Sequence, residues 1–173
     1  QRTDPRRPIL KVLNNMLGGM MSSKLFIEVR EKRGLAYYIH SDYYDFYDNG
    51  VLAASAGVDL KKIDEAIKVI ISEFQKIAAS SFSSHDLAIA KDNLVGELYL
   101  GLEDSLSVAS FVGEQALFWK KIDQPEDIAR KIQKVTASDI IKLAREIIRP
   151  EKLNLAIVGP FQKQQEEKFR RLL

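Results

Sequence analysis

The stretch from Gly18 to Tyr37, GGMMSSKLFIEVREKRGLAY, constrains the fold more than any other part of the chain. Two adjacent glycines open it, and two serines that can cap a helix follow. Gly34 then separates a short amphipathic run from an aromatic strand. Because glycine in a left-handed conformation is the commonest helix terminator, we expect Arg30 in the last turn of a helix and Tyr37 at the start of the next strand. A guanidinium and a phenol would then flank one tight corner.

Composition narrows the class of protein. The chain has 173 residues, enough for one domain with a substantial core. Its net charge of +2 comes from interspersed basic and acidic residues, so we expect neither nucleic acid nor a membrane as partner. The lack of cysteine excludes a disulfide framework and fits the reducing cytoplasm, where we place the protein. The first residue, Gln1, is not methionine, and we expect the chain to be a fragment of a longer one.

Residues 36–58 are predicted to form a β-hairpin. Asp48-Asn49-Gly50 is a strong turn signal between two β-prone runs. The first run contains five of the six tyrosines in the chain, and the second consists mainly of small residues. Small side chains allow a helix to lie close against a sheet.

The rest of the chain is predicted to be mainly helical. The segment 105–119 is apolar nearly all round, which is typical of a buried helix. Leu153 to Val158 alternates and is predicted to be a third strand. Helices are expected over 9–17, 23–33, 61–79, 85–101, 105–119, from Pro125 to about 135, and from a cap at Thr136 to a stop at Pro150.

This order of elements predicts an α+β fold with two layers. The sheet is expected to be small and mostly antiparallel, with helices packed on one face. Three strands give little support for so many helices, and we therefore expect one or more further strands upstream of Gln1. An exposed sheet edge is available for pairing with a neighbour, for example in a homodimer.

The residues of this chain do not predict a zinc site or a nucleophile. The two histidines, His40 and His85, have no HExxH or HxxEH arrangement. His40 is interpreted as a hydrogen-bonded sheet residue or a ligand, and His85 as a residue in the first turn of a helix. No serine lies in a GxSxG elbow, and the GxxxxGK[ST] phosphate loop is not met, because Leu25 follows Lys24.

Arg30 and Tyr37 remain as the candidate pair, and their spacing leaves two interpretations open. They are either a salt-bridged surface arginine and a packed strand tyrosine, or two donors aimed at a carbonyl oxygen. Such donors stabilise the charge that develops on this oxygen in acyl transfer. The tyrosine-rich strand is likewise either ordinary packing or an aromatic wall for the side chains of a peptide.

The segment LNNMLGGMMSSKLFIEVREKRGLAYYIHS closely resembles the second-domain signature of the pitrilysin and mitochondrial-processing-peptidase family, roughly LNxxLGGGMSSRLFxxVREKxGLAY. Met20 replaces a usual glycine and Lys24 a usual arginine. The family consists of zinc metallopeptidases of two related halves. The resemblance implies that residues 1–173 are a C-terminal half domain without zinc. Its arginine and tyrosine, seven residues apart, correspond to Arg30 and Tyr37.

The resemblance also implies a mechanism and its partners. Zinc and the HxxEH motif belong to an N-terminal domain or partner subunit, where water is activated with a glutamate as base. Arg30 and Tyr37 are the catalytic residues here, binding the scissile carbonyl of a peptide substrate and holding the oxyanion. This chain alone is then an inactive part of a metalloendopeptidase. The alternatives are a non-catalytic structural subunit, as in the core proteins of respiratory complexes, and a free-standing peptide-binding module.

Overall fold

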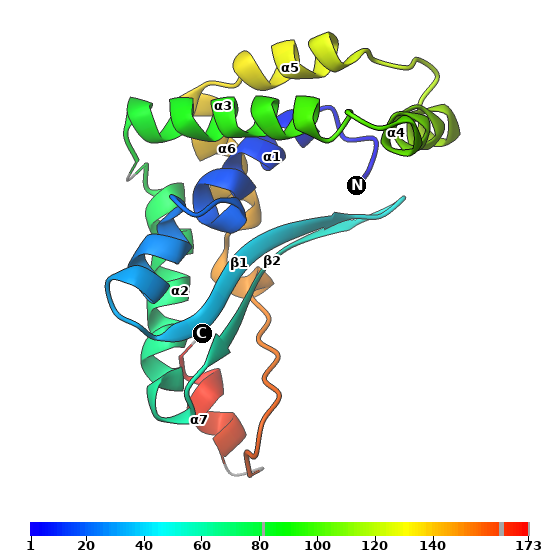
Figure 1. The fold of residues 1–173 in the computed structure, drawn as a ribbon. Coiled ribbons are helices and arrows are strands. Elements are labelled where there is room, and N and C mark those ends of the chain that lie inside the picture. The colour runs from blue at the N-terminus through cyan, green and yellow to red at the C-terminus, as the bar shows by residue number, and fades with distance from the viewer. Residues whose placement is uncertain (81, 163–164, 173) are drawn as a thin grey trace.

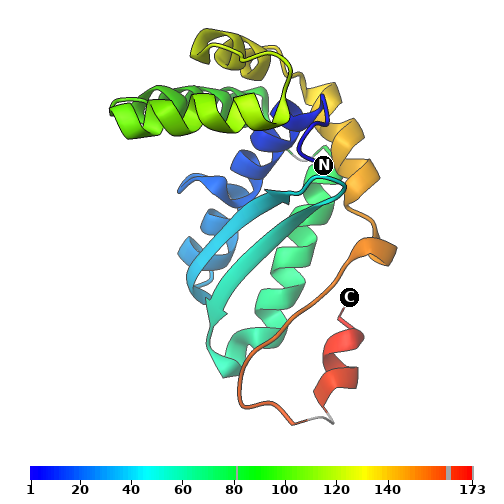
Figure 2. The ribbon, with the colours of Figure 1, turned by 90° about the vertical axis from the view of Figure 1, so that its right-hand side faces the viewer.

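The computed structural model describes residues 1–80, 82–162 and 165–172. A long β-hairpin crosses the molecule, and helices cover one of its faces (Figures 1 and 2). The elements are α1 (Arg7–Asn14), η1 (Asn15–Gly19), η2 (Phe26–Glu31), β1 (Ala36–Asp45), β2 (Gly50–Val58), η3 (Leu60–Lys62), α2 (Ile63–Ala78), α3 (Ser84–Leu100), α4 (Ser105–Phe118), α5 (Pro125–Gln133), α6 (Ala137–Ile147), η4 (Pro150–Lys152) and α7 (Glu166–Arg170). The predicted α+β class, with an antiparallel sheet and helices on one face, is confirmed.

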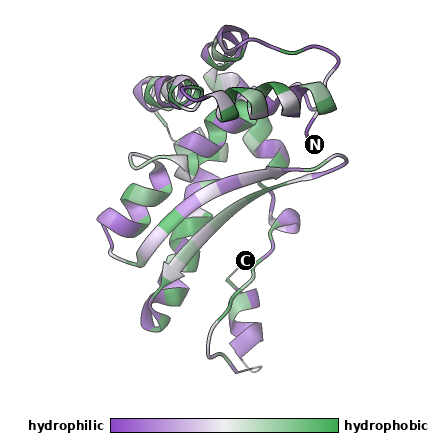
Figure 3. Cartoon of the chain, turned by 45° about the vertical axis from the view of Figure 1, so that its right-hand side comes forward, coloured by the Kyte–Doolittle hydropathy of each residue, from purple (hydrophilic) through white to green (hydrophobic). Residues whose placement is uncertain are grey.

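The β1–β2 hairpin has the predicted position and turn. The strands are antiparallel, and the Phe46 N–H donates to the Asn49 carbonyl at 2.9 Å to close the turn. Figure 3 shows hydrophobic and hydrophilic residues following one another along β1. Ile39 and Ser41 are buried on the helix side, whereas His40 between them is exposed. One face of the hairpin therefore packs on helices, and the other is open in the described chain.

The hairpin rests on α1 and on η1, a π-helical continuation of α1. The helix approaches the strand closely at Gly18, where an added Cβ would lie 2.6 Å from the Ser41 backbone nitrogen and 2.7 Å from its Oγ. The Ser41 hydroxyl in turn donates to Oδ1 of Asn14 at 2.8 Å. Because only glycine fits at this distance, the paired glycines of the sequence are first of all packing residues.

The core lies between this contact and the remaining helices. α2 runs behind the hairpin, and α3 and α5 lie side by side above α1 (Figures 1 and 2). Thr136 caps α6 as predicted, in a reciprocal arrangement with Asp139. The largest fully buried side chains of the core are Leu13, Met16, Leu17, Leu25, Ile77, Ile140, Val12, Val29, Ser23 and Ser41.

The prediction that residues 105–119 form a buried helix is wrong with respect to burial. α4 forms, with Asp104 as its cap, but none of its residues is buried. Leu106 is 77% exposed and Leu117 is 80% exposed. The helix stands at the end of α3, away from the core (Figure 1). Apolar composition shows that a helix can be buried, but burial also requires an apolar partner surface, and the contacts that α4 makes with Arg2 and Asp123 are with polar residues.

The prediction of a third strand at 153–158 is also wrong. The segment has no ladder to either strand, and the sheet in the described chain contains β1 and β2 alone. Ile157 packs against a small cluster around Ile63, Ile67 and Phe169, while Val158 is fully exposed. An alternating pattern describes one strand, whereas a ladder needs a neighbouring strand within hydrogen-bonding distance.

None of the helices in residues 1–80, 82–162 and 165–172 is long and apolar enough to cross a membrane.

Candidate functional site

The corner between η2 and β1 has the predicted construction. Gly34 adopts the left-handed conformation, with φ of 56°. Its N–H donates to the Arg30 carbonyl at 3.0 Å, and the N–H of Leu35 donates to the Val29 carbonyl at 2.9 Å. These two bonds close the end of the helix, as glycine-terminated helix ends commonly do. Arg30 therefore lies in the last turn of η2, and Tyr37 is the second residue of β1.

Ser23, one of the two predicted caps of this helix, does not cap it. The hydroxyl of Ser23 is fully buried and has no hydrogen-bond partner in the described chain. Its backbone carbonyl instead accepts from the N–H of Ile27 at 3.0 Å. The side chain therefore acts as a small packing residue beneath η2.

Arg30 is exposed and free of carboxylates. Its guanidinium lies 4.9 Å from the centre of the Phe26 ring. Glu28 on the same helix accepts from Arg33 at 2.5 Å and Lys32 at 2.6 Å. These two donors lower the pKa of Glu28 to about 2. Since Arg30 has no ion pair among the described residues, its donors remain available to a ligand.

Tyr37 is the extra residue of a β-bulge. Ala36 pairs with Val58 and Tyr38 pairs with Gly57, so Tyr37 has no partner on β2. Its side chain is 88% exposed, and its hydroxyl has no hydrogen bond within the described ranges. A bulge breaks the alternation of a strand and can direct one side chain independently of the others. The phenol therefore faces solvent beside the Gly34 corner.

The outer face of the hairpin next to Tyr37 is aromatic and polar. Tyr38 stacks on His40 with 5.9 Å between ring centres, and it lies so close over Gly57 that an added Cβ would be 2.4 Å from the ring. His40 Nε2 is 3.1 Å from Oδ2 of Asp42. His40 is thus a bonded sheet residue, which is one of its two predicted roles.

The described residues do not fit a zinc ion. Across residues 1–80, 82–162 and 165–172, no three His, Asp or Glu side chains are grouped as metal ligands. His40 has one carboxylate neighbour, Asp42. His85 lies in the first turn of α3, as predicted. Three protein ligands are the usual minimum for catalytic zinc, so no step of a reaction is assigned to a metal on this chain.

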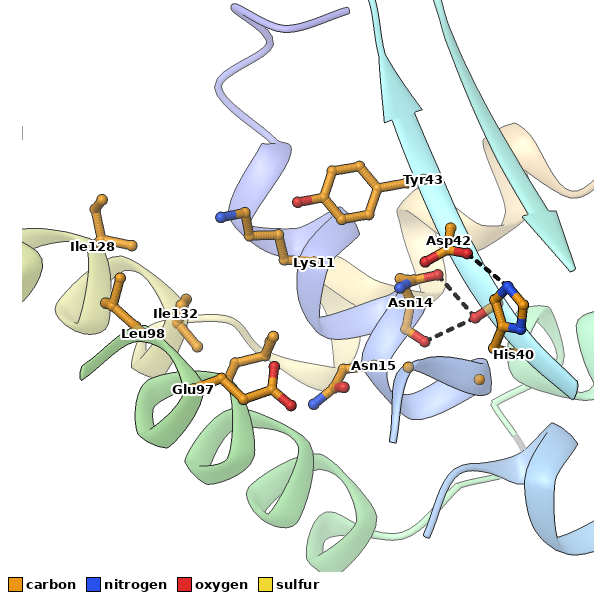
Figure 4. A pocket seen from close by; sticks show the side chains of 14 residues that line it. Lys11, Asn14, Asn15, His40, Asp42, Tyr43, Glu97, Leu98, Ile128 and Ile132 are labelled. Carbon is orange, nitrogen blue, oxygen red and sulfur yellow. Dashed lines mark hydrogen bonds and ion pairs between the residues drawn. The ribbon is translucent and has the colours of Figure 1, made fainter. Parts of the chain in front are cut away.

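A pocket of about 410 Å³ opens between α1, β1, α3 and α5 (Figure 4). Lys11 and Tyr43 line it together, and neither residue is singled out by the sequence patterns. Tyr43 has the same parity along β1 as the buried Ile39 and Ser41, which was the available signal. Lys11 reaches the same pocket from α1, and this depends on how two segments that are distant in the sequence meet.

Comparisons with known proteins agree with this fold. The sequence model of a family described as the peptidase M16 inactive domain matches residues 1–94. An uncharacterized zinc protease of Streptomyces coelicolor is 35% identical over 170 residues, which are 97% of this chain and 36% of that protein. A probable inactive metalloprotease of Bacillus subtilis is 34% identical over 146 residues, 84% of this chain and 33% of that protein.

The solved peptidase M16 inactive domain from Pseudomonas fluorescens superposes with a TM-score of 0.76. It is 22% identical in sequence, and the match covers 84% of this chain and 35% of that one. At this identity the likeness shows the fold alone. The present chain spans about a third of the length of the curated relatives that it matches.

Proposed function

The chain belongs to the peptidase M16 inactive-domain family, and from this premise we propose that it is the substrate-binding half of a zinc-dependent metalloendopeptidase. One observation carries the proposal. Arg30 and Tyr37 flank the Gly34 corner, both are exposed, and the described chain satisfies neither side chain with a polar partner.

In this proposal the two side chains act on the carbonyl of the bond to be cleaved. The Arg30 guanidinium carries a permanent charge, and the Tyr37 phenol adds a neutral donor. Together they bind and polarise the carbonyl oxygen and then hold the negative charge that develops on it. The rigid helix end at Gly34 keeps their backbones in fixed positions. The zinc-bearing half supplies the activated water, either from the same polypeptide or from a separate subunit.

The open face of the hairpin supports an extended peptide as substrate. Tyr38 and Tyr44 are half exposed on this face, with His40 and Asp42 between them. Aromatic rings with polar groups between them suit the alternating side chains of an extended peptide. This face begins at the bulge that carries Tyr37.

Kinetics of the complete enzyme, with this chain and its zinc-bearing half together, test the proposal. Arg30→Ala and Tyr37→Phe are each expected to lower kcat by on the order of a hundred-fold or more, the usual effect of losing one oxyanion donor. Zinc content should stay unchanged and Tm nearly so, because Tyr37 has no bonded partner in the described chain and Arg30 loses only its contact with the Phe26 ring. Tyr47→Phe is the matched control: it changes another exposed tyrosine of the same hairpin, at the opposite end, and should leave kcat unchanged.

Turnover close to that of the wild type in both Arg30 and Tyr37 variants would remove the pair from the mechanism. A fall in zinc content or Tm parallel to the fall in kcat would instead assign the two residues a structural role.

A second candidate function is a non-catalytic structural subunit of the same fold. It is favoured by the relative from Bacillus subtilis, which is named a probable inactive metalloprotease. Retention of both Arg30 and Tyr37 in this chain favours the peptidase. The two functions are distinguished by whether the polypeptide or its partner contains an HxxEH motif, since a structural subunit needs none.

We also propose that the sheet is completed by a strand outside these 173 residues. In the described chain β2 pairs with β1 alone, and the extended segment 153–158 has no ladder. Amide hydrogen exchange, measured on this chain and on the complete protein, tests this proposal. Slower exchange of β2 and 153–158 amides in the complete protein is expected, and equal exchange would contradict a further strand.

A further inference from the structure

The pocket between α1, β1, α3 and α5 contains two polar groups that the fold leaves unused. Lys11 and Tyr43 both line it, and the lysine amine and the tyrosine hydroxyl extend to the same side in Figure 4. Within the described parts of the chain, neither group has a hydrogen bond or an ion pair. Two groups that can donate therefore line one cavity without a bonded partner in the described chain.

Three of the polar side chains near them are already engaged. Asn15 donates to a carbonyl and a side-chain amide of α3 at 2.9 and 2.8 Å. Asn14 accepts from Ser41. Asp45, the carboxylate two residues after Tyr43, is bound by Arg7 and lies 3.5 Å from Arg2. Asp45 is thus engaged elsewhere, and Glu97, a carboxylate that also lines the pocket, forms no ion pair with the lysine in the described chain.

Burial and nearby charges determine the protonation of the two groups. Burial lowers the pKa of Lys11, and the nearby charge of Arg7 lowers it further, while Asp45 and Glu114 oppose this effect. Burial also raises the pKa of Tyr43, so its phenol keeps its proton at neutral pH and can donate. An acceptor anion beside these groups would offset the desolvation of the ammonium group.

The opposite wall determines the shape of the ligand. It is apolar and comes from α3 and α5, with the side chains of Leu94, Leu98, Ile128 and Ile132. Glu97 lies at the exposed side of the pocket and is directed inwards (Figure 4). A second negative charge on the ligand would be repelled there. The volume of about 410 Å³ is within the usual range of small-molecule sites.

We propose that this pocket binds a compact monocarboxylate with an apolar body, through Lys11 and Tyr43. The carboxylate belongs either to a free acid or to the C-terminus of a short peptide. Arg30 and Tyr37 do not line the pocket, so the test of this site is independent of the proposed peptidase function.

Calorimetric titration of the 173-residue chain tests the site with three probes: N-acetyl-leucine, 4-methylpentanoate and N-acetyl-leucinamide. Both acids are expected to bind at least about tenfold more tightly than the amide, because only they offer a charge-assisted acceptor. Equal binding of the two acids would identify a free carboxylate as sufficient, whereas tighter binding of N-acetyl-leucine would identify a peptide C-terminus. Binding of the amide as tight as that of the acids would overturn the proposal.

Variants locate the binding. Lys11→Met is expected to raise the Kd of the acids by about tenfold or more, and Tyr43→Phe by a smaller factor. Lys142→Met, an exposed lysine on α6, is the matched control and should leave the Kd unchanged. An unchanged Kd in Lys11→Met would contradict the site. If that variant does not fold, Tyr43→Phe and the comparison of acid with amide still decide the question.

Discussion

Two regions of similar composition differ in burial. The first is the contact of α1 and η1 with β1, and the second is the helix α4. Both regions are rich in apolar residues and contain glycine. Leu13 and Leu17, at the first, are fully buried, whereas Leu106 and Leu117, in α4, are among the most exposed leucines. At the first region an added Cβ on Gly18 would meet Ser41, but around Gly113 in α4 there is no atom within 4 Å.

The difference shows that shape and polar pairing, rather than apolar content, determine which helix joins the core here. The Gly18 contact combines close approach with the bond from Ser41 to Asn14. α4 has a cap at Asp104 and polar contacts to Arg2 and Asp123, but none of its residues is buried. The stability of the chain should therefore depend on the first region and be nearly independent of the second.

Truncation of a leucine gives the largest expected contrast. Leu13→Ala should lower the free energy of unfolding by about 2–5 kcal/mol, because it leaves a cavity in a fully buried site. Leu117→Ala should change it by less than about 0.5 kcal/mol. Urea denaturation of both variants measures the contrast. Equal losses would mean that α4 is packed in solution.

Replacement of glycine by alanine is expected to change the free energy of unfolding in opposite directions in the two regions. Gly18→Ala should destabilise the chain by about 1–3 kcal/mol, since the new methyl group overlaps Ser41. Gly113→Ala should stabilise it by about 0.5–1 kcal/mol, because alanine is the better helix former and space is free. The same denaturation experiment applies, and a neutral Gly18 variant would show that the helix can move away from the strand.

The smallest effect is expected at Glu28, which is partly buried and, unlike most of α4, bonded to its neighbours. Its pKa in the folded chain, about 2, is below the ordinary value of 4.5. Its contribution is therefore fully present above about pH 4.5 and is lost as the pH falls towards 2. Glu28→Gln should cost less than about 1 kcal/mol at neutral pH and nothing near pH 2.

Chemical denaturation across this pH range measures the effect of Glu28→Gln. Glu103→Gln provides the control, because Glu103 is exposed and unpaired within the described ranges. A Glu28 effect that does not change with pH would show that the ion pairs are not its source.

The features that were predicted correctly depend on local chemistry. The turn just before Gly50, the helix end at Gly34 and the cap at Thr136 each follow from the residues at or next to that position. They place Arg30 and Tyr37 on either side of one corner, as the sequence indicated.

The features that were missed depend on distant partners. The burial of α4 and the pairing of 153–158 require surfaces that periodicity does not reveal. The meeting of Lys11 with Tyr43 joins two segments about thirty residues apart. The bulge at Tyr37 depends on the register across the hairpin, in which Tyr38 pairs with Gly57 and its ring lies over that residue.

The bulge has a consequence for how this protein can evolve. Tyr37 stands outside the pleat, so the neighbouring side chains keep their places whichever residue occupies position 37. Selection for a stable fold therefore hardly acts on this residue, and selection for activity acts on it alone. If the proposed role of Tyr37 is correct, one substitution can turn an enzyme into an intact scaffold, and lineages of both kinds can descend from the same ancestor.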